Sequence, residues 1–372
     1  MSVKLQQITS LVNKLAPKSL AADWDNIGLQ LGDYNQEVEK ILVSLDINQE
    51  ILQEAVNKNV DLIIAHHPLI FDKLAKIRFD TPLGKIIQQA IKEEISIYIA
   101  HTNYDIAPGG LNDILAAKLK LDNLDILEVT TKRKYKKFVV FVPEEAVNEI
   151  KDALGSLGAG WIGNYSDCFF EQQGRGSFRA LEGTDPYSGE EDRVNQVDEY
   201  RLETIVPSHI LGKVIKKMIK VHPYEEVAYD VYPLENEGER FGLGRIGYLK
   251  ESLPLREYVD LIKEELTLDT VRVVGELDRS IKKVALCSGS GANYIKAAAF
   301  KGADLLVTGD LKYHQGQLAQ EEGLAVVDAG HYGTEKIMKE GVVEYLLTEI
   351  KSNNLEVEII KSKVNTNPFQ II

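Results

Sequence analysis

Cysteine is scarce in this chain of 372 residues, which contains only Cys168 and Cys287. The two residues lie far apart in the sequence, in different strand-like stretches. Neither a disulfide framework nor a thiolate zinc site is therefore indicated. We interpret both residues as buried free thiols of a protein in a reducing cytosol.

Long apolar runs are also missing. No stretch approaches the roughly 18 consecutive apolar residues of a membrane-spanning helix. The first seven residues, Met-Ser-Val-Lys-Leu-Gln-Gln, show no basic segment followed by an apolar core. We therefore expect a cytoplasmic protein that makes no contact with a membrane.

Basic residues are outnumbered by acidic ones. The chain has 43 Lys and Arg against 57 Asp and Glu, a net charge of −14. This excess opposes binding to DNA or to an anionic membrane surface, so no nucleic-acid partner is expected. We interpret the basic run 131–137 as the solvated start of a strand. An anionic substrate would need a local cation to hold it.

From residue 40 onward, apolar strand-like runs alternate with helical patterns. This alternation predicts a parallel-sheet-rich α/β domain with helices on both faces. The expected strands are 40–46, 61–66, 95–101, 282–287, 304–308, 324–328 and 355–361. The expected helices are 48–58, 81–93, 110–119, 254–266, 292–300, 312–322 and 334–350.

The pattern changes between residues 126 and 248. Strand-like and helical stretches follow one another there in the order βαββαβ, which is typical of a ferredoxin-like α+β unit. Residues 174–189, rich in glycine and polar side chains, are predicted to form a mobile hairpin or loop. A chain of this length favours two domains. We predict an α/β domain made of residues 1–126 and 248–372, interrupted by an inserted α+β domain at 127–247.

Two glycine-rich segments were considered as ligand-binding loops. The segment Gly242-Leu-Gly-Arg-Ile-Gly247 has the letters of the dinucleotide fingerprint but not its setting between a buried strand and a helix. The loop 288–291 does lie between an expected strand and an expected helix. Its backbone N–H groups at Ser288, Gly289 and Gly291 are candidates for anion or substrate contact. The alternative is a tight structural turn.

Histidines follow the expected strands repeatedly. They stand at carboxyl strand ends, where open parallel sheets bind ligands: His66, His67, His101 and His331. Asp105 and Glu335 add carboxylates, and the spacing of four between His331 and Glu335 lets both face one point. Nitrogen and oxygen donors without thiolates suit Zn, Mn, Fe, Co or Ni. Because the donors exceed the needs of one catalytic zinc, a dinuclear centre is the simplest interpretation. Histidines placed there by coincidence are the alternative.

Asp310 and His314 repeat the pattern of polar groups after a strand. Either could orient a ligand imidazole from a second layer, or face the substrate as an acid or base. For Asp310, helix capping is the alternative.

Together these motifs resemble a known family. They are His66-His-Pro68, His101-Thr-Asn-Tyr-Asp105, Thr308-Gly-Asp310 with His314, and His331-Tyr-Gly-Thr-Glu335. The family is that of the GTP cyclohydrolase I type 2 homologues, also called NGG-interacting factor three-like proteins, and the segment 25–30 fits it as well. The resemblance implies two divalent metal ions per chain, zinc foremost, held by His66, His67, Asp105, His331 and Glu335. It also implies toroidal homohexamers.

The expected insert resembles the trimer-forming CutA and PII-like proteins. The resemblance is carried by His222-Pro-Tyr-Glu-Glu-Val-Ala-Tyr-Asp230. A regulatory ligand of such an insert would be expected near Cys168 and the loop 174–189.

The resemblance implies a hydrolase of C–N bonds. A metal-bridging hydroxide would open the imidazole ring of GTP or attack another small heterocycle. Glu335 or His101 would relay the proton, and Arg245 or the loop 288–291 would hold phosphates. The alternative is a metal-binding regulatory or scaffold protein with a ligand-sensing insert and no turnover of its own.

Overall fold

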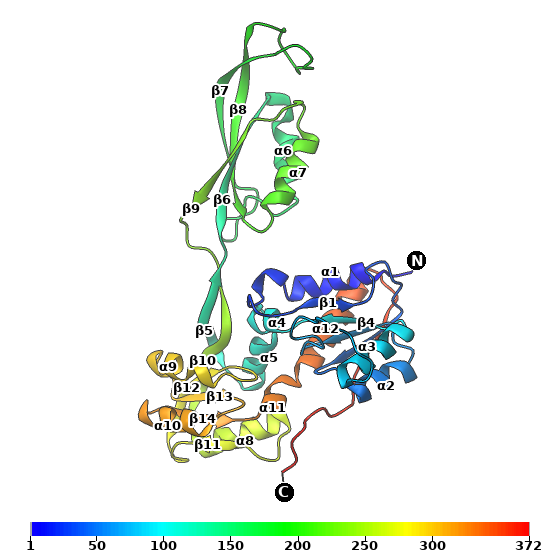
Figure 1. Ribbon diagram of the computed structural model, residues 1–372. Helices are drawn as coiled ribbons and strands as arrows, with labels where there is room; N and C mark the ends of the chain where they lie inside the picture. The colour runs from blue at the N-terminus through cyan, green and yellow to red at the C-terminus, as the bar shows by residue number, and fades with distance from the viewer. Residues whose placement is uncertain (1, 372) are drawn as a thin grey trace. The chain divides into compact units, whose positions relative to one another are not determined.

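The computed structural model describes residues 2–371, and the chain forms two compact units (Figure 1). The first unit consists of residues 1–131 and 241–372, and the second of residues 132–240. The first unit has the mixed α/β architecture that the sequence predicts, with helices on both faces of its sheets. Within the described residues, no helix is long and apolar enough to cross a membrane.

The first sheet of the α/β unit has the strand order β1-β4-β3-β2-β15 within the described residues. Neighbouring strands are parallel except for β1, which pairs with β4 in the antiparallel sense. Strands β3 and β4 are buried at every residue, as expected for parallel strands covered on both faces. The bounds are β1 (Gly28–Leu31), β2 (Lys40–Ser44), β3 (Leu62–Ala65), β4 (Ser96–Ile99) and β15 (Glu358–Lys361).

The second sheet of this unit has the order β11-β14-β13-β12-β10-β5. Strands β12, β13 and β14 are parallel, whereas β10 and β11 run antiparallel to their neighbours β12 and β14. The alternation of strands and helices in the sequence does not reveal this division into two sheets. The bounds are β5 (Asp122–Lys132), β10 (Arg240–Pro254), β11 (Arg272–Val274), β12 (Ser280–Leu286), β13 (Leu305–Thr308) and β14 (Ala325–Asp328).

The helices of the α/β unit begin where local caps direct them. The Asn48 side chain accepts a hydrogen bond from Ile51 N at the start of α2, and Thr81 caps α3 ahead of Pro82. The bounds are α1 (Leu5–Leu15), α2 (Gln49–Asn57), α3 (Pro82–Lys92), α4 (Thr102–Ile106), α5 (Leu111–Lys118), α8 (Leu255–Leu266), α9 (Ile295–Phe300), α10 (Tyr313–Glu321), α11 (His331–Glu335) and α12 (Met338–Ser352).

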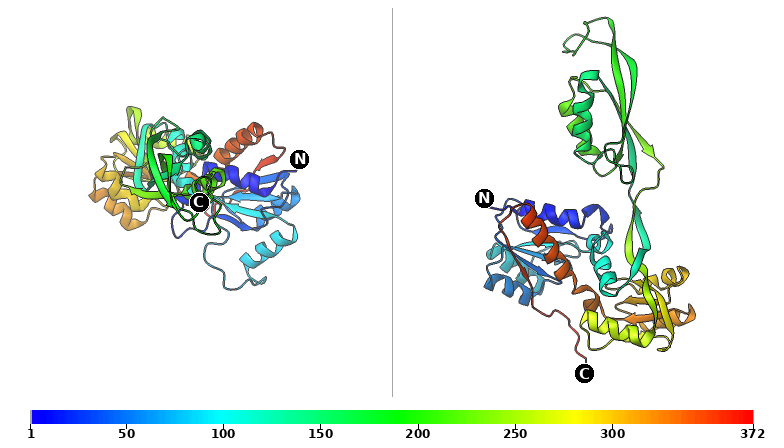
Figure 2. Two further views of the ribbon diagram at one scale, coloured as in Figure 1. Left: turned by 90° about the horizontal axis from the view of Figure 1, so that it is seen from above. Right: turned by 180° about the vertical axis from the view of Figure 1, so that it is seen from behind.

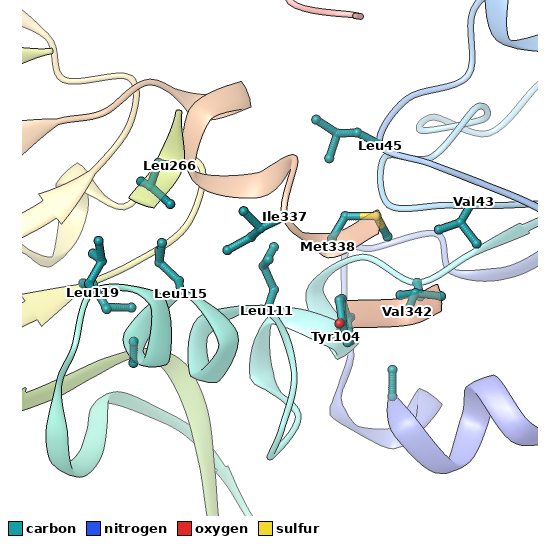
Figure 3. Packing of buried hydrophobic residues seen from close by; sticks show 14 of the residues in the cluster. Val43, Leu45, Tyr104, Leu111, Leu115, Leu119, Leu266, Ile337, Met338 and Val342 are labelled. Atoms are coloured by element: carbon teal, nitrogen blue, oxygen red, sulfur yellow. The ribbon is translucent and has the colours of Figure 1, made fainter. Parts of the chain in front are cut away.

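A continuous hydrophobic core joins the two sheets (Figure 3). It includes Val43 of β2 and Val307 of β13, together with Leu111 of α5 and Met338 of α12, all fully buried. Each such side chain contributes about 1.5–3 kcal/mol by leaving water. Helices α2 and α3 pack on the opposite face of the first sheet, and α9 and α10 on the opposite face of the second. This core holds the carboxyl ends of β3, β4 and β14 in place.

The second unit, residues 132–240, has its own sheet (Figure 2) and its own hydrophobic core. Its strands form an antiparallel sheet in the order β7-β8-β6-β9, and α6 and α7 pack on one face. The βαββαβ order of these elements is that of a ferredoxin-like unit. The bounds are β6 (Tyr135–Val142), α6 (Val147–Gly155), β7 (Phe169–Arg179), β8 (Val194–Pro207), α7 (Leu211–Val221) and β9 (Tyr229–Leu234).

The structure decides between the two alternatives for residues 174–189, a hairpin or a loop. Residues 174–179 continue β7 and pair with β8 as far as Val194, so they form a hairpin. The connection is therefore confined to residues 180–193. A glycine-rich sequence indicates flexible backbone, but here pairing with β8 satisfies that backbone's hydrogen bonds.

Candidate metal centre

The four histidines singled out in the sequence converge in the α/β unit. His66 and His67 follow β3, His101 follows β4, and His331 is the first residue of α11, after β14. Among the residues that the structure describes, two groups could hold a metal ion: His66, His67 and His101, and His67, His331 and Glu335. Within each group the candidate ligand atoms lie within 4.8 Å of one another. The two groups share His67.

Each of the four imidazoles has an acceptor beside its Nδ1 atom. The pairs are His66 with Ala100 O at 2.8 Å, His67 with Asp46 Oδ1 at 2.6 Å, His101 with Asp25 Oδ1 at 2.9 Å, and His331 with Asp310 Oδ2 at 2.7 Å. An acceptor at Nδ1 places the proton there and leaves the Nε2 lone pair for a cation. Metal-binding histidines in proteins have this arrangement.

His66 shows most directly that the cluster fits a metal. Its side chain is fully buried, and burial lowers its pKa to about 3, so the ring is neutral. Its Nε2 atom lies 3.6 Å from Asp105 Oδ1 and 3.9 Å from Glu335 Oε1. No group within residues 2–371 makes a hydrogen bond with this atom. A buried acceptor facing two carboxylates without a donor is costly unless a cation lies between them.

Glu335 is the carboxylate between the two histidine rings. Its Oε2 atom lies 2.9 Å from Nε2 of both His67 and His331, yet makes no well-directed hydrogen bond among the described residues. Burial alone would raise the pKa of Glu335, but His331 and His67 hold that pKa well below its ordinary value. Glu335 is therefore a carboxylate, as metal coordination requires.

Protons on His67 and His331 balance this carboxylate when no metal is bound. Burial opposes the charged form of His67, but Asp46 and Glu335 outweigh it and raise the pKa to about 10. Glu335 raises the pKa of His331 to about 9, against the effect of burial. The cluster therefore holds positive charge at the positions where a metal ion would bind.

Asp105 lies on α4, with 7% of its surface exposed. Burial, and after it the charge of Glu335, raises its pKa to about 7. Ser288 Oγ donates a hydrogen bond of 3.2 Å to Asp105 Oδ1. A nearby cation would return this carboxyl group to its charged form.

Three aspartates fix the orientation of the rings. Asp310 was expected to orient an imidazole, and the structure places it against His331. Its backbone φ of +54° is in the left-handed region, which aspartate tolerates better than most residues. Asp25 and Asp46 were not among the predicted site residues. Asp46 could have been identified from the sequence, because it ends an expected strand. Asp25 lies in a polar loop 76 residues before its partner His101.

The three N–H groups of the loop 288–291 that were candidates for anion contact are engaged within the α/β unit. The N–H groups of Ser288, Gly289 and Gly291 donate to side chains of the same unit: Asn112 Oδ1 at 2.9 Å, Thr334 Oγ1 at 2.9 Å and Thr308 Oγ1 at 2.8 Å. These N–H groups are therefore not free to bind an anion, whereas Ser288 Oγ supports Asp105. Gly289 has a φ of +60°, and a Cβ atom there would lie 2.1 Å from Glu335 Oε1. Glycine is required at that position for Glu335 to approach the cluster.

Arg245 is also not available for phosphate. It is 5% exposed and forms a two-pronged ion pair with Asp113 through Nε and Nη2. Its other N–H groups donate to the carbonyl oxygens of Gly242, Gly244 and Ala107. Because all five donors of the guanidinium are engaged, Arg245 joins β10 to the segment 107–113. The surrounding glycines lie within β10, so the segment has no dinucleotide-loop setting.

His314 is not brought to the cluster. It lies on α10, is exposed, and its Nδ1 atom is 2.9 Å from Gln317 Oε1. Asp310 does lie beside the histidines, as its position after a strand predicts. His314, one helical turn further along the chain, does not.

Two exposed aromatic rings lie beside the cluster. The Trp24 ring is 6.0 Å from the His101 ring and 5.8 Å from that of Phe71, measured between centroids. Trp24 is 62% exposed and Phe71 54%. Phe71 belongs to the long connection 69–80, whose start is fixed where Asn26 and Gln30 donate to Ile70 O. Apolar ring faces are thus open to a ligand beside His101.

Comparison with known proteins identifies the family. The family model Duf34/NIF3 (NGG1p interacting factor 3) matches residues 3–368. A GTP cyclohydrolase 1 type 2 homolog of Bacillus subtilis is 46% identical over 371 residues, 100% of this chain and 99% of the relative. The crystal structure of a Bacillus cereus protein related to NIF3 aligns with a TM-score of 0.91 at 46% identity, covering 100% of both chains. Staphylococcus aureus protein SA1388 aligns with a TM-score of 0.79 at 32% identity, covering 100% and 99%. The chain therefore belongs to the Duf34/NIF3 family.

Proposed function

We propose that this chain is a hydrolase that uses two divalent metal ions to attack a C–N bond of a small planar heterocycle. The observation that carries the proposal is the pair of overlapping donor groups that share His67. The name of the relatives, GTP cyclohydrolase 1 type 2 homolog, makes GTP the first substrate to test.

Some residues of the site would bind the metal ions directly, and others hold those ligands in position. His66, His67, Asp105, His331 and Glu335 would hold the ions. Bound divalent ions would lower the pKa of a water molecule toward neutrality and polarise the substrate. Imidazole and carboxylate donors without thiolates suit zinc, and also Mn, Fe, Co or Ni.

His101 is the better candidate for proton transfer. Its Nδ1 atom is held by Asp25 at 2.9 Å, which leaves Nε2 to exchange a proton with substrate, and its side chain is 16% exposed. Glu335, by contrast, is 4% exposed and kept as a carboxylate by two histidines. Of the two residues expected to relay protons, Glu335 is better suited to binding metal. His101 also belongs to one candidate donor group, so a ligand role is its alternative.

The aromatic rings beside His101 support a planar substrate. Trp24 and Phe71 present exposed faces on which a heterocycle can stack, and one stacked base contributes about 1–3 kcal/mol to binding. A Trp24→Ala variant should therefore weaken binding of a purine nucleotide while keeping the metal content of the wild type.

The first test is metal content followed by turnover. Protein purified without added metal is analysed by elemental mass spectrometry, and the same sample is incubated with GTP and its products identified by liquid chromatography. About two metals per chain with release of formate or a formamidopyrimidine supports the proposal. Two metals with intact GTP removes GTP as the substrate and leaves the metal centre. Protein that binds fewer than two metals even when loaded overturns the dinuclear centre.

We also propose that the chain assembles into homohexamers. The support is the family resemblance, which implies a toroidal ring. Light scattering after size exclusion tests it, because a hexamer has six times the chain mass of 41.6 kDa.

A metal-binding regulatory protein is the second candidate function. It is favoured by one observation, a cavity of about 470 Å³ in the inserted unit, residues 132–240. Metal exchange without turnover of any heterocycle, together with a ligand in that cavity, would support it.

A further inference from the structure

The inserted unit contains a cavity that is separate from the candidate metal centre and to which the family assignment gives no role. It lies between the hairpin of β7 and β8, the connection 180–193 and the segment 224–228, and its volume is about 470 Å³. All of its lining residues belong to residues 132–240. This volume is within the usual range for sites that bind small molecules.

The walls of the cavity are mainly apolar and aromatic. Phe141, Phe178 and Val197 contribute apolar surface. The rings of Tyr187 and Tyr224 lie 5.5 Å apart between centroids, tilted by 42°. Ring faces of this kind attract cations as well as apolar groups.

Acidic side chains outnumber basic ones around the cavity. Glu199, Glu225 and Glu226 line it, against a single lining base, Arg179. Arg179 Nη1 already donates 2.7 Å to the carbonyl oxygen of Asp192. The cavity therefore carries a net negative charge in partly apolar surroundings, where charge interactions are stronger than in water.

Glu199 and Tyr224 lie close together at the cavity. A Cβ atom on Gly176 would lie 2.3 Å from Glu199 Oε2, so the carboxylate occupies the space that this glycine leaves. The Tyr224 hydroxyl is buried and makes no well-formed hydrogen bond to any described residue. Burial, and next the charge of Glu199, raises the pKa of Tyr224. A half-buried carboxylate beside a tyrosine hydroxyl favours a ligand that brings a charged donor.

Hydrogen bonds hold the connection 180–193, which forms one wall of the cavity. The Asn195 side chain, 8% exposed, accepts from Glu190 N at 3.0 Å and donates to Glu190 O at 2.7 Å and Arg193 O at 3.2 Å. Asp185 N donates 2.8 Å to Glu225 Oε2, which ties the connection to the segment 224–228. The cavity is therefore formed before any ligand binds.

We propose that this cavity binds a small organic cation, a primary ammonium group on an apolar or aromatic body. The ammonium would lie against Glu199 and the Tyr224 hydroxyl, and the body would pack between the tyrosine rings and Phe178. This site is independent of the proposed hydrolase function, because none of its residues belongs to the metal cluster.

The test uses the full chain and three probes of similar shape and different charge. Benzylamine is cationic at pH 7, benzyl alcohol is neutral and benzoate is anionic. Isothermal titration calorimetry should show benzylamine binding about tenfold more tightly than the other two, the scale of a partly desolvated cation with aromatic faces and a carboxylate.

A matched pair of variants locates the site. Glu199→Gln neutralises one of the three lining glutamates and keeps the side-chain size, and should weaken benzylamine binding about fivefold or more. Glu149→Gln makes the same change on α6, at an exposed position outside the cavity lining, and should leave binding unchanged. Circular dichroism confirms that both variants fold.

Three outcomes would overturn the proposal. Equal binding of benzylamine and benzyl alcohol would show an apolar cavity without charge selection. Equal weakening by the two variants would show a general effect of protein charge. Absence of benzylamine binding to folded wild-type chain at millimolar concentration would show that the cavity is not a cation site.

Discussion

The candidate metal centre and the cavity of the inserted unit differ in where their side chains come from and in how these are held. The cluster takes its donors from the ends of buried strands and short helices, and each ring is held by a further acceptor. The cavity is lined on one side by a surface connection, residues 180–193, and its polar side chains are mainly tyrosines and glutamates. The cluster is therefore sensitive to single changes in its supports, whereas the cavity should tolerate them better. The following predictions test that contrast, from the largest expected effect to the smallest.

Replacing His66 should give the largest effect. His66→Ala removes a fully buried donor from a candidate metal-binding group, so we expect the variant to lose at least one of the proposed metal ions and all of the proposed hydrolase activity. Elemental analysis measures the metal. His314→Ala, which removes an exposed histidine outside the cluster, should keep the metal content of the wild type. Benzylamine binding should be the same in both variants, and its loss in His66→Ala would show that the two sites are coupled.

Replacing Asp46 tests whether the supports matter as much as the ligands. Asp46→Ala removes the acceptor 2.6 Å from His67 Nδ1, and we expect metal affinity to fall about 10–100-fold. Asp46→Asn should lose less, because an amide oxygen can still accept that proton. Competition with a fluorescent chelator measures both affinities. Equal losses in the two variants would mean that the charge of Asp46, and not its orientation of the ring, is what matters.

Two glycine substitutions compare the tolerance of the two regions. Gly289→Ala would place a Cβ atom 2.1 Å from the buried Glu335, at a φ of +60°, and should lower stability by about 1–2 kcal/mol from the backbone alone, with metal loss in addition. Gly176→Ala would meet Glu199, whose half-buried side chain can turn away. Gly176 itself has an ordinary backbone φ, so this variant should lose little stability. Gly109→Ala has a φ of +71° and no neighbour within 4 Å, and so measures the backbone cost alone. Equal destabilisation by Gly289→Ala and Gly109→Ala, with metal retained, would contradict the close approach to Glu335.

The pH dependence of the metal-free protein should be the smallest effect. The pKa values of His67 and His331 are raised to about 10 and 9, from an unfolded value of about 6.5. A raised pKa stabilises the fold fully below the unfolded value, and this contribution is lost as pH rises through the folded value. Calorimetry of chelator-treated protein should therefore show the melting temperature falling between pH 7 and 10. Metal-loaded protein should change less, because the ions replace these protons, and parallel curves would contradict this exchange.

Much of the fold could be predicted because short aliphatic strands alternate with helices. The run Leu62–Ala65 lies between polar residues in the sequence and is a buried strand in the structure. What could not be predicted is which strands become neighbours. The division into two sheets and the pairing of residues 174–179 with β8 both depend on contacts between distant parts of the chain.

The same limit applies to the site. The histidines at strand ends could be predicted as site residues, because parallel strands bring their carboxyl ends to one edge of a sheet. The segment 25–30 was matched to the family, but the role of Asp25 was not predicted, because its partner His101 lies 76 residues further along the chain. Arg245 was misread for the same reason, since its partner Asp113 lies 132 residues away. Asp46 could have been found by applying the strand-end argument to carboxylates as well as to imidazoles.

The attachment of the inserted unit has a consequence for protein engineering. The chain leaves the α/β unit through β5 and returns through β10, and these strands are hydrogen-bonded neighbours in one sheet. Neighbouring strands can be joined by a short turn. Residues 132–240 can thus be excised as a cassette without drawing distant chain ends together, giving a shortened chain that carries the candidate metal centre alone.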